Sequence, residues 1–277
     1  MRKICLFIVS LLAPLAVCAA PNPEMIVVCY PGGSVNVKDA NGAMSSMLRV
    51  VERVGQWQEN SFNSVFSTKP DECRKLMTEK NPKFAITSLG LYLELRNQHN
   101  LLPVAQPKIK GRTSERYRVM IQKDKYKSLD ELKGKTLGGT VLEEPSFISK
   151  IVFAGKYDSA GFILKPSNQA IRALRSLSKG ELDAVILNEQ QFGGLGSLHL
   201  EKPLEAVFTS EEIPLMGVVA NSVTTTEEER TRFGKALKEM CTDAEGKKLC
   251  ELFGVESFVN VDEAVYEPMV KLWHEGK

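Results

Sequence analysis

The sequence predicts an α/β protein of two lobes, each a mainly parallel sheet flanked by helices. Three observations predict this fold class. Short apolar segments alternate with segments of helical periodicity, the alternation starts again after the polar stretch 108–115, and the 277-residue chain is long enough for two separate cores. Strand–helix alternation favours parallel strands with helices on both faces of each sheet.

The first set of elements opens with the continuous apolar strand 25–30, which ends in the turn 31–34. Met44, Leu48 and Val51 then recur at helical spacing and indicate a helix with one buried face. The elements predicted next, in chain order, are strand 61–66, helix 71–79, strand 84–86, helix 91–97 and strand 101–106.

The second set opens with strand 117–122 and a helix start at 128–131, where Ser128 and Glu131 fit a capping box. Strand 135–137 follows, with Gly138 and Gly139 as a turn before a helix that starts at 144–146. The remaining predicted elements are strand 163–164, a helix ending at Gly180, strands 183–187, 204–208 and 215–220, and a long helix capped by Thr226.

The first twenty residues have the pattern of a secretory signal peptide. Arg2 and Lys3 precede the apolar run 4–17, and small residues at 17–20 form a cleavage site, so we expect an exported protein. Residues 15–18 also resemble a bacterial lipobox, which would leave Cys18 acylated, but Val17 stands where Gly or Ala is expected and favours plain cleavage. No later segment approaches the roughly 20 apolar residues of a membrane span.

Charge and composition exclude one class of partner. The chain has 36 basic and 34 acidic residues, and removal of Arg2 and Lys3 with the signal peptide leaves 34 of each. No basic run or basic–aromatic stripe is present in the sequence. We therefore expect no nucleic-acid partner.

Four of the six cysteines remain after the signal peptide: Cys29, Cys73, Cys241 and Cys250. An even number in an oxidising compartment predicts disulfides, with three connectivities open. Proximity in sequence favours Cys241–Cys250, which leaves Cys29 with Cys73. Metal binding is the alternative, but the sequence has no CxxC, and its three histidines are distant from the cysteines.

Catalytic motifs are missing from the sequence. It contains no GxSxG, HExxH or Walker loop, and the glycines at 194 and 196 lack the third glycine of a dinucleotide turn. We therefore expect no catalytic residue, metal or cofactor, and a binding function rather than an enzyme.

Three segments in this order resemble one known family: YKSLDELKGKTLGG at 126–139, LSKGELDAVILNEQQF at 177–192 and IPLMGVVANS at 213–222. The chain is similar to type II periplasmic substrate-binding proteins, in particular the phosphate/phosphonate branch that serves ABC transporters. The resemblance implies a monomer in the periplasm, a small-molecule ligand in the cleft between lobes, closure on binding, and a permease partner. It places lobe one at 21–109 and 210–277, and lobe two at 110–209.

Candidate ligand-binding residues are those that follow the strands, because open α/β sheets bind ligands at the carboxyl ends of their strands. Each also has a local structural explanation: the glycines at 32 and 33 as a turn, and the polar residues as helix caps. The full set is Tyr30, Gly33, Ser34, Thr87, Ser88, Thr140, Ser146 and Asn188.

Two glutamates stand in the turn where phosphonate-binding relatives usually carry Ser, Thr and Gly. Thr140 and Glu143 fit a capping box, and Glu144 fits an N-cap before Pro145, which together predict that both carboxylates face solvent. The alternative is that one glutamate enters the cleft and binds a cation or an amine. Two further functions stay open: a ligand-sensing receptor that acts on a signalling partner, and an enzyme on the same fold.

Overall fold

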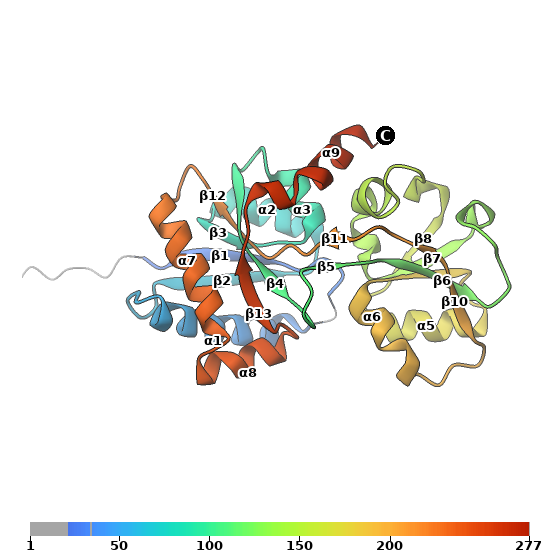
Figure 1. The fold of residues 1–277 in the computed structure, drawn as a ribbon, viewed down its shortest axis with the longest axis horizontal. Helices are drawn as coiled ribbons and strands as arrows, with labels where there is room; N and C mark the ends of the chain where they lie inside the picture. Colours follow the sequence, from blue (N-terminus) through green and yellow to red (C-terminus); the bar gives the residue numbers. More distant parts are fainter. Residues whose placement is uncertain (1–21, 34, 277) are drawn as a thin grey trace, which may run out of the picture.

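The structure, a computed structural model, describes residues 22–33 and 35–276, and these form two α/β lobes side by side (Figure 1). The predicted signal peptide, with Cys18, lies outside the described residues, as does Ser34. Among the residues described, no helix has the length and apolar character needed to cross a bilayer.

The first lobe is built on a six-stranded sheet in the order β13-β4-β12-β3-β1-β2. The strands β1, β2, β3 and β4 run in one direction, whereas β12 and β13 run in the opposite direction. Their bounds are β1 Glu24–Cys29, β2 Phe62–Ser67, β3 Phe84–Ile86, β4 Leu101–Lys108, β12 Val218–Asn221 and β13 Ser257–Asn260.

The second lobe has a five-stranded sheet in the order β10-β6-β9-β7-β8, in which only β6 opposes the common direction. The bounds are β6 Arg118–Gln122, β7 Thr136–Gly139, β8 Ile163–Pro166, β9 Ala184–Leu187 and β10 Leu204–Thr209. Both sheets are therefore mainly parallel with reversed strands, as the predicted fold class requires.

Helices cover both faces of each sheet. Successive residues of a strand point to opposite faces, so each face carries apolar side chains that the helices bury. In β1, Ile26 and Val28 pack toward α1 and α7, whereas Val27 and Cys29 pack toward α2 and α3. In the second lobe α5 covers the face with Val185 and Leu187. The helix bounds are α1 Val37–Val54, α2 Pro70–Lys80, α3 Leu89–Leu95, α4 Pro145–Phe147, α5 Ala170–Lys179, α6 Glu189–Gly193, α7 Glu227–Met240, α8 Ala244–Leu252 and α9 Glu267–Glu275.

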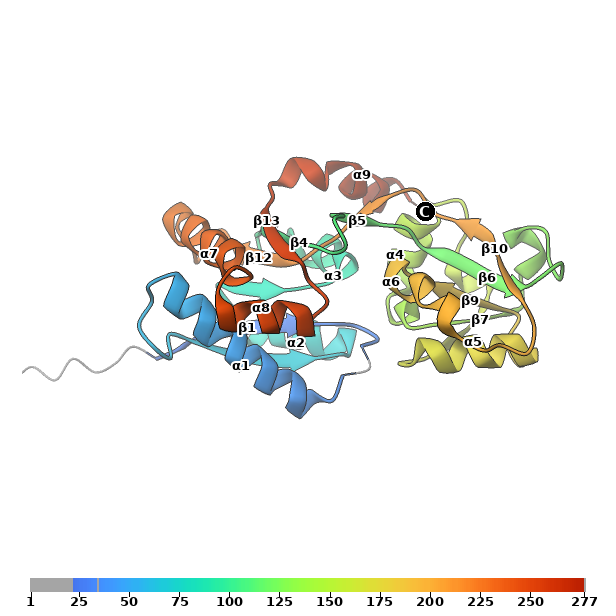
Figure 2. The same cartoon turned by 60° about the horizontal axis from the view of Figure 1, so that its bottom comes forward.

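Two crossing segments join the lobes and pair with each other. The short strands β5 (Ser114–Glu115) and β11 (Ile213–Pro214) form an antiparallel ribbon between the two sheets (Figure 1). The helix α9 runs alongside the ribbon toward the second lobe (Figure 2), and Lys150 Nζ there donates to the carbonyl of Trp273 at 3.0 Å. The Tyr266 hydroxyl, just before α9, donates to the Leu215 carbonyl at 2.8 Å.

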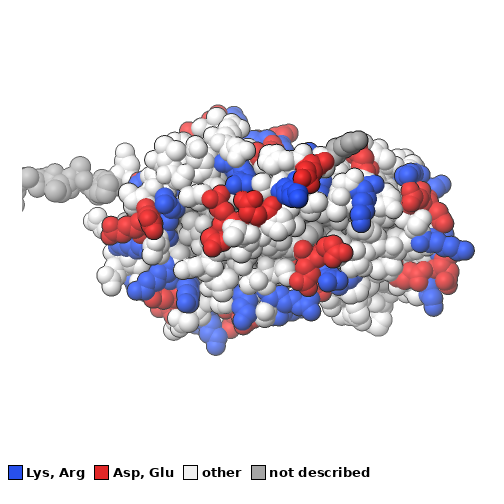
Figure 3. All heavy atoms as spheres, turned by 45° about the horizontal axis from the view of Figure 1, so that its top comes forward, with Lys and Arg blue, Asp and Glu red and all other residues white. Residues whose placement is uncertain are grey.

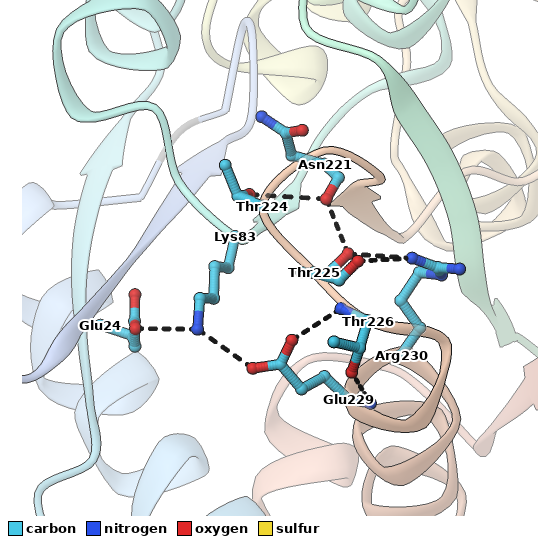
Figure 4. Close-up of polar contacts among 8 residues, drawn as sticks. All are labelled: Glu24, Lys83, Asn221, Thr224, Thr225, Thr226, Glu229 and Arg230. Carbon is cyan, nitrogen blue, oxygen red and sulfur yellow. Dashed lines mark hydrogen bonds and ion pairs between the residues drawn. The ribbon is translucent and has the colours of Figure 1, made fainter.

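The start of α7 is fixed by the capping box that the sequence predicts. Thr226 and Glu229 satisfy each other's backbone N–H groups, and the Glu229 carboxylate also pairs with Lys83 at 3.0 Å (Figure 4). Lys83 pairs with Glu24 as well, at 3.1 Å. This network lies at the amino ends of β1 and β3, away from the carboxyl ends where ligands bind in such sheets.

Two local predictions need correction. The capping box at Ser128 is not formed: the Ser128 side chain makes no cap hydrogen bond, the Glu131 carboxylate accepts from the backbone N–H of Lys127, and the segment is a 3-10 helix, Leu129–Leu132. Gly138 and Gly139 belong to β7 rather than to a turn. A Cβ at Gly139 would overlap Ile186 of the neighbouring strand, so glycine here serves close strand packing.

Both predicted disulfides are present. Cys29 and Cys73 join the end of β1 to α2 with Cα atoms 5.8 Å apart, and Cys241 and Cys250 join the end of α7 to α8 at 5.7 Å. The first bridge closes a separation of 44 residues and the second one of 9. A longer loop loses more conformational entropy when it is closed, so the first bridge constrains the unfolded chain more.

Replacement of Cys29 and Cys73 together by alanine is expected to lower the free energy of unfolding by about 2–5 kcal/mol. The matched pair Cys241→Ala and Cys250→Ala is expected to cost less, because its loop is shorter. Urea unfolding of both double variants measures the difference. A larger loss from the second pair would contradict the loop-length argument.

Candidate ligand site between the two lobes

The candidate site lies where strand ends of the two sheets face each other. The turn after β1 meets the turn after β7: Gly32 has φ of 70°, and a Cβ on it would overlap the backbone carbonyl of Thr140. Only glycine combines this left-handed conformation with so close an approach. The lobes are therefore in direct contact at this point.

The start of α3 meets the second lobe through Glu144. Ser88 caps α3, because its Oγ accepts from the N–H of Leu91 at 3.2 Å, and the same hydroxyl donates to Glu144 Oε1 at 2.8 Å. A Cβ on Gly90 would overlap the Glu144 carboxylate and crowd Phe147 of α4. The Glu144 carboxylate of the second lobe thus contacts the first turn of α3 in the first lobe.

Burial raises the pKa of Glu144 to about 7, even though hydrogen bonds from Ser88 and the Leu91 N–H favour the charged form. Arg74 also favours the charge, but it is engaged at 2.6 Å with both Asp71 and Glu94. Among the described residues, Glu144 has no ion-pair partner within 4 Å.

A second half-buried carboxylate lies in the crossing strand β5. Glu115 accepts from the hydroxyl of Tyr117 at 2.8 Å, and burial raises its pKa. Tyr117 is buried, and its pKa is raised by that burial and by the charges of Glu115 and Glu144. The pKa of Tyr30 is raised by partial burial and by Glu115. Two carboxyl groups and two phenols therefore line the candidate site: Glu115, Glu144, Tyr30 and Tyr117.

The start of α6 borders the site from the second lobe. Asn188 and Gln191 form a capping box, and Gln191 Nε2 donates to Thr140 Oγ1 at 2.9 Å. Glu189 pairs with Arg118 at 3.0 Å, and although partial burial opposes the change, this pairing lowers the Glu189 pKa. The Arg118 guanidinium also stacks over Phe192, 4.1 Å from the ring centroid. This arginine is therefore engaged by protein groups.

Thr87 follows β3 and precedes the cap of α3. Its side chain is 4% exposed, and within the described part of the chain its Oγ1 has no hydrogen-bond partner. Buried hydroxyls nearly always have a partner, so an unpaired one needs a reason. Thr87 stands at the carboxyl end of its strand, beside Ser88, where a ligand would supply that partner.

The structure brings together Tyr30, Gly33, Thr87, Ser88, Thr140 and Asn188 only in part. Ser88 and Thr140 lie at the contact between lobes, whereas Asn188 caps α6, with its Oδ1 accepting from the N–H of Gln191. Ser146 lies exposed in α4, and Ser34 lies outside the described residues. Gly33 packs beneath the ring of Tyr30, which leaves that ring 55% exposed.

The expectation that both glutamates face solvent is correct for Glu143 only, and the expected caps are not formed. Glu143 is exposed, and neither Thr140 nor Glu144 makes a side-chain cap hydrogen bond. Thr140 is instead engaged by Gln191, and Glu144 by Ser88. Glu144 thus enters the contact between the lobes, which is the first part of the alternative interpretation. The binding of a cation or an amine by this residue stays a prediction.

Glu115 and Tyr117 are site residues that the sequence reasoning missed. The sequence pattern puts Glu115 in the polar stretch 108–115 and Tyr117 at the start of strand 117–122, and nothing local marks either residue as facing the site. Their position in the chain could have indicated this role, because both belong to the first segment that crosses between the two lobes.

The described residues hold no cluster of three or more metal-ligating side chains. On the face shown in Figure 3, acidic and basic side chains are interspersed and no large patch has a single sign.

A comparison with models of protein families identifies one family. The model of a family described as "ABC transporter, phosphonate, periplasmic substrate-binding protein" matches residues 41–266. A search of curated protein sequences gave no significant match.

Solved structures of similar fold include three bacterial proteins. A binding protein component of an ABC phosphonate transporter from Pseudomonas aeruginosa is 16% identical with a TM-score of 0.68, covering 91% of this chain and 85% of its own. A Prochlorococcus marinus protein in complex with methylphosphonate is 16% identical, TM-score 0.65, covering 92% and 98%. A Xanthomonas citri protein bound to ATP is 10% identical, TM-score 0.70, covering 91% and 96%. At these identities the likeness shows the two-lobe fold.

The pKa of Glu144 predicts a pH dependence of stability. Its folded value of about 7 lies above the ordinary 4.5, so the native state binds more protons between these values and loses stability as pH rises through 7. Glu144→Gln removes this titration. Between pH 5 and pH 8 the unfolding temperature of the unliganded wild type is expected to fall more than that of the variant.

The exposed neighbour offers a matched control, because Glu143→Gln removes the same charge from the same turn. Its pH profile is expected to follow the wild type. Parallel profiles for wild type and Glu144→Gln would show that Glu144 does not titrate in this range.

Proposed function

The chain belongs to the family of periplasmic substrate-binding proteins of phosphonate ABC transporters, and on this premise we propose that it captures a small polar ligand between its lobes and delivers it to a permease. The proposed site combines Tyr30, Thr87 and Ser88 of the first lobe with Thr140 and the start of α6 from the second. Gly33, Ser34, Ser146 and Asn188 are proposed to border it.

Direct contact between strand ends of the two sheets is the observation that carries this proposal. Gly32 touches Thr140, and Ser88 donates to Glu144, so a ligand bound here touches both lobes. Such a ligand stabilises the closed form, because its contacts to one lobe are lost on opening. The unpaired hydroxyl of Thr87 supports a polar ligand.

We propose that lobe one comprises 21–109 and 210–277 and that lobe two comprises 110–209. The membership of the strands in the two sheets supports these boundaries, because the chain leaves the first sheet after β4 and returns to it at β12. The helix α9 is the exception, since it also contacts the second lobe through Lys150.

We propose a periplasmic monomer that is released from its signal peptide and has a permease as partner, and membership of the family supports this location and partner. A binding role is supported by the family and by the residues between the lobes, which include no recognised catalytic set. A receptor that docks on a signalling protein would close in the same way. Genes for a permease and an ATPase beside this gene would favour transport.

Thr87→Val tests the site, because it replaces the unpaired hydroxyl by a methyl group of similar volume. The affinity for the ligand is expected to fall at least tenfold, whereas the stability of the unliganded protein is retained. A thermal-shift screen of phosphate, phosphite, methylphosphonate, methanesulfonate, amino acids and polyamines supplies the ligand, and calorimetric titration gives the affinities.

Thr225→Val is the matched control, since this buried hydroxyl donates to the carbonyl of Asn221 at 2.6 Å, in the network of Figure 4. It is expected to lower stability by about 1 kcal/mol without changing affinity. Unchanged affinity in Thr87→Val would remove this residue from the site. Failure of every member of the panel to stabilise the protein would contradict the proposed capture of a small polar ligand.

A further inference from the structure

The Glu144 carboxylate accepts the hydrogen bonds that the start of α3 would otherwise offer to a ligand anion. The hydroxyl of Ser88 donates to it at 2.8 Å, and the N–H of Leu91 lies close enough to favour its charge. Gly90 gives the carboxylate room, because any side chain there would overlap it. Three features at the start of α3, the hydroxyl of its cap Ser88, the glycine at 90 and the N–H of Leu91, which also donates to Ser88 Oγ, are thus fitted to a carboxylate of this chain.

A negatively charged head group cannot share this position with an ionised Glu144. Two like charges in contact repel strongly when water is excluded, and neither has a cation to compensate it here. The groups that face Glu144 are Ser88 and Glu94 of α3, Arg74 of α2, and Tyr117 before β6. Arg74 is the single cation among these, and it is already paired with Asp71 and Glu94.

We propose that Glu144 determines the charge of the ligand: it excludes negatively charged head groups from the start of α3, so the group a ligand presents there is an uncharged or cationic hydrogen-bond donor. This inference rests on the proposed ligand capture between the lobes. The chain would then share its fold with binding proteins for phosphonates but differ from them in the charge of the ligand that it prefers.

The test uses the mature protein and methylphosphonate as the probe, at pH 8. Glu144→Gln keeps the shape of the side chain and its ability to accept from Ser88, but it removes the charge and adds a donor. Methylphosphonate is expected to bind this variant at least tenfold more tightly than it binds the wild type. Glu143→Gln, in the same turn but exposed, is expected to bind it like the wild type.

The wild type alone gives a second measurement, which does not depend on the variant folding. Methanesulfonate keeps one negative charge across the neutral range, so a change in its affinity with pH reports on the protein. Its affinity for the wild type is expected to rise as pH falls from 8 to 6. In Glu144→Gln the affinity is expected to change less.

Equal methylphosphonate affinity in wild type and Glu144→Gln, or no binding by either, would overturn the assignment of Glu144. Tight methylphosphonate binding by the wild type would overturn it as well. In each of these cases ligand capture still stands if another member of the panel stabilises the wild type. If no probe stabilises any of the proteins, the proposed function fails as well.

Discussion

The pairing of β5 with β11 is the constraint on which the arrangement of the two lobes depends. The predicted separation into two cores is not complete, because one buried cluster holds residues of both lobes. The chain passes between the two sheets through the two segments that pair at this ribbon. Two short antiparallel strands fix the relative direction of the segments, yet they leave room for bending, because they share only two residue pairs. Glu115 belongs to this ribbon, so one carboxylate of the candidate site lies in the connection between the lobes.

The contact between the lobes is apolar on one side and polar on the other. Leu89 and Leu91 of α3 belong to the same buried cluster as Phe147 and Ile148 of the second lobe. Next to this cluster, Ser88 and Glu144 form the polar contact. The apolar part favours closure without regard to the ligand, since hydrophobic contact is non-directional. Discrimination between ligands is left to the polar part, where an unpaired group is costly.

Sequence reasoning predicted the parts of the molecule that local pattern determines. The end of α5 at Gly180, with φ of 84°, and the capping box of α7 follow from a few neighbouring residues. The position of Glu144 does not, because its partner Ser88 is 56 residues away and belongs to the other lobe. Ser128 shows the same limit on a smaller scale, because its partner in the expected box, Glu131, accepts from the backbone N–H of Lys127 instead.

A carboxylate between the lobes also answers a requirement of the closed form. When the lobes meet without a ligand, the hydroxyl of Ser88 and the first N–H groups of α3 are removed from water and need acceptors. Ser88 accepts from Leu91, but its own proton would have no acceptor without Glu144. In a site that binds an oxyanion, the ligand satisfies these donors. Here Glu144 of the chain itself supplies the acceptor. Because burial between the lobes removes its carboxylate from water, the charged form is disfavoured and its pKa is raised.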